Sequence, residues 1–461
     1  MSIVGKNINI TQFIDSRPLT RFQVGVITCC ASVNALDGID SQSIGVAAPF
    51  IAKGLGLNLA HFGPIFSMAL LGASIGAATF GPLADYIGRK VLLIVATLMI
   101  GAFTFLTAVA DSVPELMVFR FLAGIGLGGA TPCFISLTSE FAPARSRAML
   151  VTLMWSAFPL GAMIGGLLNS AIIVRLGWHA IFYIGGVLPL VLAIVLALYL
   201  PESIKFILSR RNDPAAVRQI VERFGEPFVD ADARFVLDEI HVPGIQLLRL
   251  FSEGRAWGTL LLWIPLFMGF GVLTVAVLWT PSLLHLNGIS PAATAFVVAF
   301  SGLGAFVGQS IAGHMIERFG IVPVLAPSFL LGAVATAGLG YGASSIGLAA
   351  VFIGLVGLFV GLGTAGAIAL STTIYPTAIR SSGVGMGMAI ARLGQVVGPL
   401  IAGTLLGYGW TADHIMLVIA VGAAISAVFV ALLSVWMATQ ETGAHEAAST
   451  SSQGTPQATS K

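Results

Sequence analysis

Four ionisable residues lie in segments that are otherwise apolar: Asp37, Asp40, Arg120 and Arg392. An ionisable side chain near the middle of a membrane costs about 2.5–3.5 kcal/mol even on the milder insertion scale, so each marks a candidate functional site. Asp37 and Asp40 are three residues apart, which places them on similar sides of a helix. Two carboxylates so close in a low dielectric do not both ionise readily, so the pair is a candidate for proton exchange. The alternative is a helix break at Gly38, with Asp37 binding backbone groups.

The two arginines are candidate counter-ions. Arg120 is predicted on the outer side of its helix, level with Asp37, where it either neutralises that carboxylate or extends to the membrane surface. Arg392 is predicted about nine residues, or roughly 14 Å, inside its helix, too deep to reach the surface. Its planar guanidinium could bind a substrate carboxylate through two hydrogen bonds. The alternative is an internal ion pair with Asp37 or Asp40.

The composition indicates a membrane protein. Of 461 residues, 57% are apolar and only 9% are charged, about a third of the charge of an ordinary soluble domain. This excludes a water-soluble enzyme. The net charge of +2 does not indicate nucleic acid binding. The three cysteines have no metal-ligand spacing, so we expect neither a metal nor another cofactor.

Stretches of about 20 apolar residues predict twelve membrane-spanning helices, so the expected fold class is an all-α polytopic membrane protein. They lie at 22–50, 63–84, 91–110, 115–138, 148–172, 179–200, 257–285, 292–313, 321–340, 346–371, 383–406 and 413–438. The expected regions are an N-terminal tail (1–21), a first six-helix bundle (22–200), a central loop (201–256), a second bundle (257–438) and a disordered tail (439–461). Of the 22 Lys and Arg residues, 18 fall in the tails and loops of one side, which predicts that both termini are cytoplasmic.

The chain is also an internal repeat. The segment 81–88 (GPLADYIG) recurs as 313–320 (GHMIERFG), 232 positions later, and Gly177-Trp178 recurs as Gly409-Trp410 at the same offset. Arg392 has Leu160 as its counterpart in the first half, so the repeat alone does not require a charge there. Two parallel six-helix halves with a site between them are the plan of a secondary transporter. The sequence has no Walker-type ATP-binding motif, so an ion gradient or the substrate's own gradient must drive transport.

These motifs resemble a known family. The segment 81–90, with its Gly-x-Leu-Ala-Asp-x-x-Gly-Arg-Lys pattern, resembles the loop signature of the major facilitator superfamily, and Pro201-Glu202-Ser203 resembles a motif of its sugar and organic-ion branches. Asp37-Gly38-Ile39-Asp40, followed by Ala48-Pro49, resembles the aromatic acid:proton symporter branch, which includes the 4-hydroxybenzoate/protocatechuate permeases. The resemblance implies a major facilitator fold and a functional requirement for the two aspartates. Tyr86 departs from the Arg usual at its position and weakens one potential ion pair.

The remaining candidates are binding and gating residues. Possible ring or polar contacts to a substrate are Trp155, Phe158, Trp279, Asn34, Gln42 and Gln309, all of which could equally be packing or lipid-facing. A conformational latch is expected from Gly81, Asp85, Gly88, Arg89, Glu140 and Arg145, with a second-half copy in Glu317, Arg318 and Arg380. The alternative for the basic members is anchoring on the cytoplasmic side. The central loop is expected to be a solvated amphipathic linker.

The sequence therefore predicts a bacterial inner-membrane transporter that imports an aromatic monocarboxylate with protons by alternating access. Its expected partners are that small carboxylate, protons and the lipid bilayer, with no nucleic acid, and we expect a monomer. The rival functions are a proton-coupled antiporter that exports drugs or aromatic metabolites, and a receptor built on an inactive transporter fold. The sequence does not distinguish hydroxybenzoates, protocatechuate, phenylpropionates and phenoxyacetates.

Overall fold

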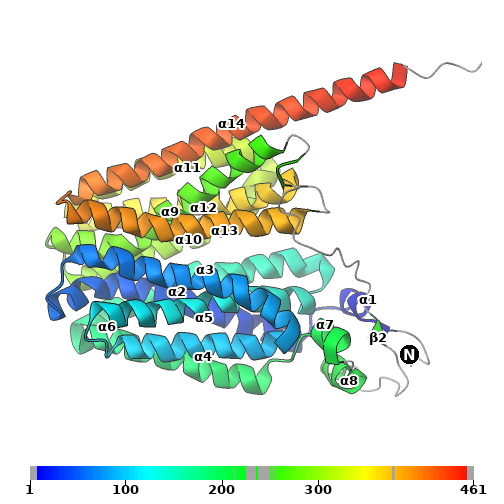
Figure 1. Ribbon diagram of the computed structural model, residues 1–461, viewed down its shortest axis with the longest axis horizontal. Coiled ribbons are helices and arrows are strands. Elements are labelled where there is room, and N and C mark those ends of the chain that lie inside the picture. Colours follow the sequence, from blue (N-terminus) through cyan, green and yellow to red (C-terminus); the bar gives the residue numbers. More distant parts are fainter. Residues whose placement is uncertain are drawn as a thin grey trace, which may run out of the picture.

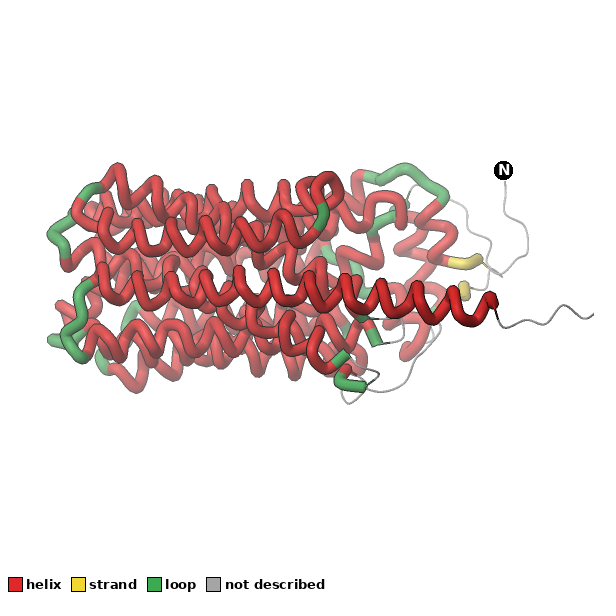
Figure 2. The backbone as a smooth tube through the Cα atoms, turned by 90° about the horizontal axis from the view of Figure 1, so that it is seen from above, coloured by secondary structure: helices red, strands yellow, loops and turns green. Residues whose placement is uncertain are grey.

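The structure is a computed structural model that describes residues 8–211, 213–224, 235–236, 250–252, 255–375 and 379–453. Long helices run side by side along the longest axis of the molecule, and short elements gather at one end (Figures 1 and 2). We call that end, which carries α1, α7 and α8, the basic end, and the other the opposite end. The basic end is the one that the distribution of Lys and Arg predicts to be cytoplasmic.

Eleven helices of the described chain are long and apolar enough to cross a membrane. The long helices are α2 (Arg21–Gly54), α3 (Phe62–Ile87), α4 (Arg89–Thr107), α5 (Val113–Phe141), α6 (Ala144–Tyr199), α9 (Ala256–Leu286), α10 (Pro291–Phe319), α11 (Ile321–Tyr341), α12 (Ile346–Ile374), α13 (Arg380–Gly407) and α14 (Ala412–Gln453). The 56-residue α6 contains a non-helical residue, Gly177, and therefore consists of two consecutive spans. The expected total of twelve spans is thus confirmed.

Backbone geometry repeats between the halves. The described glycines with positive φ are Gly56, Gly88 and Gly177 in the first half and Gly288, Gly320 and Gly409 in the second, each pair 232 positions apart. A left-handed or related backbone conformation disfavours residues with a Cβ, which explains glycine at these turns. The repeat seen in the sequence is therefore a repeat of the fold.

Small residues allow the helices to pack closely within and between the halves. A Cβ on Gly128 of α5 would collide with the backbone carbonyl of Ala73 in α3, so glycine is required at this crossing. Between the halves, α6 packs on α10, α3 on α13 and α2 on α9. Gly63 of α3 and Gly403 of α13 approach closely enough that a Cβ on Gly403 would lie 2.9 Å from the Gly63 Cα.

The N-terminal tail and central loop are partly folded at the basic end. Their elements are β1 (Ile8–Asn9), α1 (Ile10–Asp15), α7 (Ile204–Phe206), the π-helix η2 (Ile207–Arg211), α8 (Pro214–Glu222) and β2 (Phe235–Val236). Phe13 of α1 packs on Phe224 with ring centroids 6.1 Å apart, within a cluster that also contains Val217 and Ile220 of α8. The apolar residues of α8 recur at helical spacing and bury one face, so this part of the central loop is an amphipathic helix packed on the basic end.

At the C-terminus, α14 continues beyond the predicted end of its span at 438 and projects past the other helices (Figure 1). The segment from 439 to Gln453, which we expected to be disordered, is therefore helical. Its alanine, glutamate and glutamine residues have high helix propensity, so a helix can continue through a polar sequence. Composition alone did not reveal this extension.

Candidate functional site

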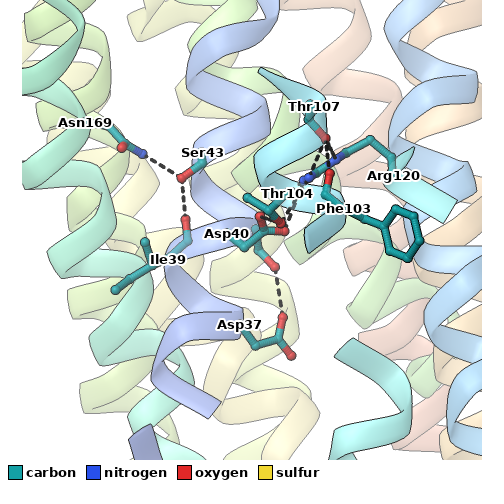
Figure 3. A network of polar contacts seen from close by, with 10 residues as sticks. Asp37, Ile39, Asp40, Ser43, Phe103, Thr104, Thr107, Arg120 and Asn169 are labelled. Atoms are coloured by element: carbon teal, nitrogen blue, oxygen red, sulfur yellow. Dashed lines mark hydrogen bonds and ion pairs between the residues drawn. The ribbon is translucent and has the colours of Figure 1, made fainter. Parts of the chain in front are cut away.

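Arg120 and Asp40 form a buried ion pair inside the first half (Figure 3). Arg120 Nη1 lies 3.2 Å from both carboxylate oxygens of Asp40. The Arg120 Nε and Nη2 atoms donate to Thr107 Oγ1 at 3.1 and 2.8 Å, and Nη2 also donates to Thr104 Oγ1 at 3.1 Å. Thr104 Oγ1 in turn donates to Asp40 Oδ1 at 2.8 Å. Arg120 is 1% exposed and Asp40 5% exposed, so the group is sealed and internally hydrogen-bonded.

One helix, α4, brings two hydroxyl groups to this pair. Thr104 and Thr107 lie one turn apart on α4, and Arg120 enters from α5. Thr107 accepts from Arg120 while donating to the Phe103 carbonyl at 2.8 Å, which fixes the direction of its hydroxyl. Neither threonine was a predicted site residue. A buried ion pair offsets its desolvation cost only when further hydrogen bonds complete it, and these hydroxyls supply them.

Asp37 is separate from that pair, although it is only three residues from Asp40 on α2. Figure 3 shows Asp40 turned toward Thr104 and Arg120, while Asp37 lies apart from the group. Asp37 is half-buried and accepts a hydrogen bond from Ser41 Oγ at 3.3 Å. The prediction that Arg120 neutralises Asp37 was wrong, since its carboxylate partner is Asp40. A helical shift of three residues turns a side chain by about 60°, which is enough to change its partner.

Arg392 lies in α13 of the second half and is also half-buried. Its Nη1 donates to Gln395 Oε1 at 3.4 Å, and within the described residues its guanidinium has no other hydrogen bond. No ion pair within 4.0 Å joins Arg392 to Asp37, both of which are described residues. The guanidinium therefore keeps hydrogen-bond donors that no described residue uses.

Three of the predicted substrate contacts are buried in packing. Asn34 donates from Nδ2 to the carbonyls of Met154 at 2.9 Å and Trp155 at 3.2 Å, which ties α2 to α6. Gln42 donates to the Val298 carbonyl at 3.1 Å and ties the two halves together. Trp279 is fully buried, with its ring 5.6 Å from that of Phe66. The other three predicted substrate contacts are half-buried; they are Trp155, Phe158 and Gln309.

The predicted latch residues form a network within the first half, at the basic end. Arg89 is ion-paired with Glu140, and Asp85 lies 3.4 Å from Arg89. Glu140 Oε2 accepts from Ser203 Oγ at 2.6 Å. Asp85 is otherwise open to the surroundings, with 64% of its side chain exposed.

Glu202 extends this network and was not among the predicted site residues, although its motif was recognised. Its Oε1 accepts from the backbone N–H groups of Lys90 at 3.0 Å and Ser203 at 2.9 Å. A carboxylate at the beginning of α4 neutralises the positive end of the helix dipole. A Cβ on Gly88 would collide with this carboxylate, so the glycine leaves room for it.

The other predicted latch residues lie elsewhere. Arg145 donates to the Arg17 carbonyl at 2.6 Å and so holds the N-terminal segment instead of joining the network. Gly81 lies near Pro132 of α5. Glu317 and Arg318 are exposed and form no ion pair with another described residue. The side chain of Arg380 lies outside the described part of the chain.

The halves are joined near the opposite end. Two hydrogen bonds between described residues cross from one half to the other here, Gln42 Nε2 to Val298 O and Ser67 Oγ to Val396 O, the latter at 2.7 Å. Phe50 and His285 add a ring contact at 5.9 Å. The network at the basic end, by contrast, stays within the first half.

The chain is similar to known transporters. A family model described as Major Facilitator Superfamily matches residues 30–288 and 270–458. The 4-hydroxybenzoate transporter PcaK of Pseudomonas putida is 34% identical over 427 residues, covering 92% of this chain and 95% of that protein. The gallate transporter of Pseudomonas putida is 33% identical over 408 residues, covering 87% and 90%. A solved bacterial homologue of the human lysosomal transporter Spinster, inward-facing and unoccupied, matches with TM-score 0.68 at 17% identity, covering 90% and 97%, which supports the fold alone.

Proposed function

This chain belongs to the Major Facilitator Superfamily and is a transporter, not an enzyme. From this family membership we propose that it imports an aromatic monocarboxylate by proton symport. The observation that carries the proposal is Arg392, a half-buried guanidinium in the second half whose hydrogen bond to Gln395, at 3.4 Å, is its one hydrogen bond to a described residue. An unsaturated guanidinium within a membrane span is suited to bind a carboxylate. The relatives named for 4-hydroxybenzoate and gallate support an aromatic acid as the substrate.

The substrate ring is assigned to the three half-buried candidates. Trp155 and Phe158 of α6 offer aromatic faces, and Gln309 of α10 offers an amide for a ring hydroxyl. Aromatic pairs prefer offset or edge-to-face contact, which a planar benzoate can satisfy against either ring. The buried residues Asn34, Gln42 and Trp279 serve the site indirectly, by holding the helices that form it.

Proton coupling is assigned to Asp37, with Asp40 and Arg120 as its neighbouring pair. Transport by alternating access rocks one half over the other around a central site. Protonation of a carboxylate between the halves changes the electrostatic free energy of that movement. The drug or metabolite exporter predicted as an alternative would use the same charges with protons moving in the opposite direction to the substrate.

Gating is assigned to the basic-end network of Asp85, Arg89 and Glu140. We place this end in the cytoplasm and the protein in the bacterial inner membrane, as the distribution of basic residues predicts. In this structure the two halves are hydrogen-bonded to each other near the opposite end. We therefore propose that the substrate reaches its site from the cytoplasmic end in this conformation. Re-forming contacts between the network and the second half would close that access.

Uptake into proteoliposomes tests the function. We expect radiolabelled 4-hydroxybenzoate to accumulate when the lumen is alkaline relative to the outside, and accumulation to stop when a protonophore dissipates the gradient. Equal uptake with and without the gradient would contradict proton symport. Accumulation only with an acidic lumen would instead identify an antiporter, and no uptake or binding of any aromatic acid in a competition panel would favour the receptor.

A further inference from the structure

We propose that Trp279 is the gate residue of the opposite end. Its indole ring seals the two halves against each other there, while its buried N–H group, which has no acceptor, favours their separation. This role rests on the proposed alternating access but not on the identity of the solute. Trp279 is then a positioning residue that acts on the movement of the halves, instead of the substrate contact that the sequence predicts.

Trp279 lies where helices of both halves meet. It is on α9, seven residues before the helix ends at Leu286, or about 10 Å from that end. Its neighbour Leu278 lies against α2 of the first half, because a Cβ on Gly45 would be 3.0 Å from the Leu278 carbonyl oxygen. This part of α9 therefore lies at the boundary between the halves.

Aromatic rings of the first half cover the indole. The Phe66 ring of α3 packs edge-to-face with it, with ring centroids 5.6 Å apart and ring planes at 84°. Phe62, one turn earlier on α3, packs on Phe66 with centroids 5.7 Å apart. None of these three residues is more than 1% exposed. Such rings bury a large apolar area, so their packing stabilises the closed arrangement of this end.

The indole also contacts α13, where glycine leaves room for it. A Cβ on Gly403 would lie 3.2 Å from Trp279 Cζ2 and 2.9 Å from the Gly63 Cα of α3. Further along the same pair of helices, Ser67 Oγ donates to the Val396 carbonyl at 2.7 Å. The indole is thus enclosed by α3 and α13 together. Separation of these two helices must therefore uncover it.

The indole nitrogen is a buried donor without a partner. Trp279 Nε1 is inaccessible to solvent and donates to no other described residue. An indole N–H can only donate, and a buried tryptophan usually finds an acceptor for it. A donor without an acceptor is unfavourable, whereas the same donor is satisfied once water reaches it. The closed arrangement therefore carries a penalty that opening removes.

Ring packing and the unpaired donor have opposite effects on the gate. The rings favour the closed arrangement, and the N–H group favours the open one. A solute-linked transition needs two arrangements of similar free energy, because a ligand can shift the equilibrium only by its differential affinity for them. An unpaired donor inside an apolar seal keeps the closed end from becoming too stable to open.

The test measures how often the opposite end opens, through a cysteine that replaces Phe50 in the full-length protein. Phe50 of α2 contacts His285 of α9 across the two halves, with ring centroids 5.9 Å apart. The native cysteines are all buried, so they give little background. The rate at which the new cysteine reacts with a membrane-impermeant maleimide is proportional to the fraction of time that this end is open.

Two changes at position 279 are expected to shift this rate in opposite directions. The amino acid 3-benzothienylalanine, introduced there by codon suppression, keeps the two fused rings but replaces the N–H group with sulfur. The cysteine should then react about three- to tenfold more slowly, because the closed end loses its penalty. Trp279→Ala removes the seal, so the cysteine should react several-fold faster.

The matched control is the same analogue at Trp263, which is also on α9. The Trp263 ring packs on Phe251, in the segment that precedes the helix, with centroids 5.4 Å apart. The analogue at position 263 is expected to leave the reaction rate unchanged. An equal slowing from position 263 would overturn the proposal.

Two results at position 279 would also overturn it. An unchanged or higher rate with the analogue would mean that the N–H group does not favour opening. An unchanged rate in Trp279→Ala would mean that the indole is not the seal. If Trp279→Ala does not fold, the two analogue proteins decide the question alone.

Failure of the proposed function is distinguishable, because the labelling uses no solute. If the two changes at position 279 act in opposite directions but no aromatic acid is taken up, the gate stands and the proposed import is wrong. If uptake is proton-coupled but the analogue at position 279 reacts like the wild type, the import stands and only the gate is wrong.

Discussion

The two arginines inside the spans have opposite surroundings. Arg120 of the first half is sealed, with all its guanidinium nitrogens hydrogen-bonded to Asp40 and two threonines. Arg392 of the second half is half-buried and has one long hydrogen bond to Gln395 in the described chain. The same residue type is therefore structural where its donors are used and a candidate ligand-binding group where they are not. Depth in the membrane alone does not separate these roles.

The two halves also differ in the repeated loop segments, 81–88 and 313–320. In the first half, Arg89, Glu140, Ser203 and Glu202 connect α4, α5 and the beginning of the central loop. In the second half, Glu317 and Arg318 are exposed. The repeat thus preserves the backbone turns at Gly88 and Gly320 more faithfully than the ionic contacts around them.

The largest expected effect comes from breaking the sealed pair. Arg120→Gln leaves Asp40 as a buried unpaired charge, so we expect a loss of about 3–5 kcal/mol of stability, seen as a large fall in melting temperature in detergent. Adding Asp40→Asn should recover part of that loss, because no charge then remains unpaired. The exposed Arg175→Gln serves as the control and should change stability by less than about 0.5 kcal/mol. A melting temperature for Arg120→Gln equal to that of Arg175→Gln would show that the pair contributes little.

The corresponding change in the second half should affect binding more than stability. Arg392→Lys keeps the charge but removes the planar, two-pronged donor geometry, so affinity for 4-hydroxybenzoate should fall about 10- to 100-fold, or about 1.4–2.8 kcal/mol. The melting temperature should change little, since few contacts are lost. Calorimetric titration measures the first and thermal unfolding the second. Strong destabilisation without loss of affinity would reverse the contrast between the two arginines.

Closure at the opposite end can be tested at the contact of Gly63 with Gly403. Gly403→Ala places a Cβ 2.9 Å from the Gly63 Cα, which forces the halves apart at a cost of about 1–2 kcal/mol. Gly407→Ala, one turn along α13, is a matched control because its Cβ would lie 3.5 Å from Ala60, an ordinary contact.

The measurement uses a cysteine that replaces Phe50 in both glycine variants. This cysteine should react several-fold faster with a membrane-impermeant thiol reagent in the Gly403→Ala protein. The native cysteines are all buried, so their background should be low. Equal reaction rates in the two glycine variants would rule out this close contact as the closure.

The smallest effect is expected in the loop network. Glu202→Gln removes the charge that faces the beginning of α4, and we expect a loss of about 0.3–1 kcal/mol, decreasing as salt screens the interaction. Glu317→Gln, in the exposed second-half copy, should be neutral. Melting temperatures at low and high salt measure both. Equal shifts for the two variants would argue that the network adds nothing beyond surface charge.

Much of the architecture could be predicted from the sequence, because membrane spans and repeats leave local signals. The spans follow from runs of apolar residues, and the paired glycine turns follow from the 232-residue offset. The site was predicted less completely. Thr104 and Thr107 complete the Arg120 group, yet threonine is common on apolar helices and gave no signal of its own. Glu202 did carry a signal in its motif, but its contact with Lys90 joins residues 112 positions apart.

What the sequence by itself determined is the class of protein, its division into two halves and the identity of the few charges within the membrane. These properties depend on composition and on periodicity along the chain. Only the tertiary structure decided that Arg120 binds Asp40 instead of Asp37, and that Arg392 contacts Gln395 in its own helix. The reason is that the partner of a side chain depends on how each helix is rotated about its axis and packed. That rotation is determined by contacts with distant helices, and a change of about 60° exchanges one partner for another.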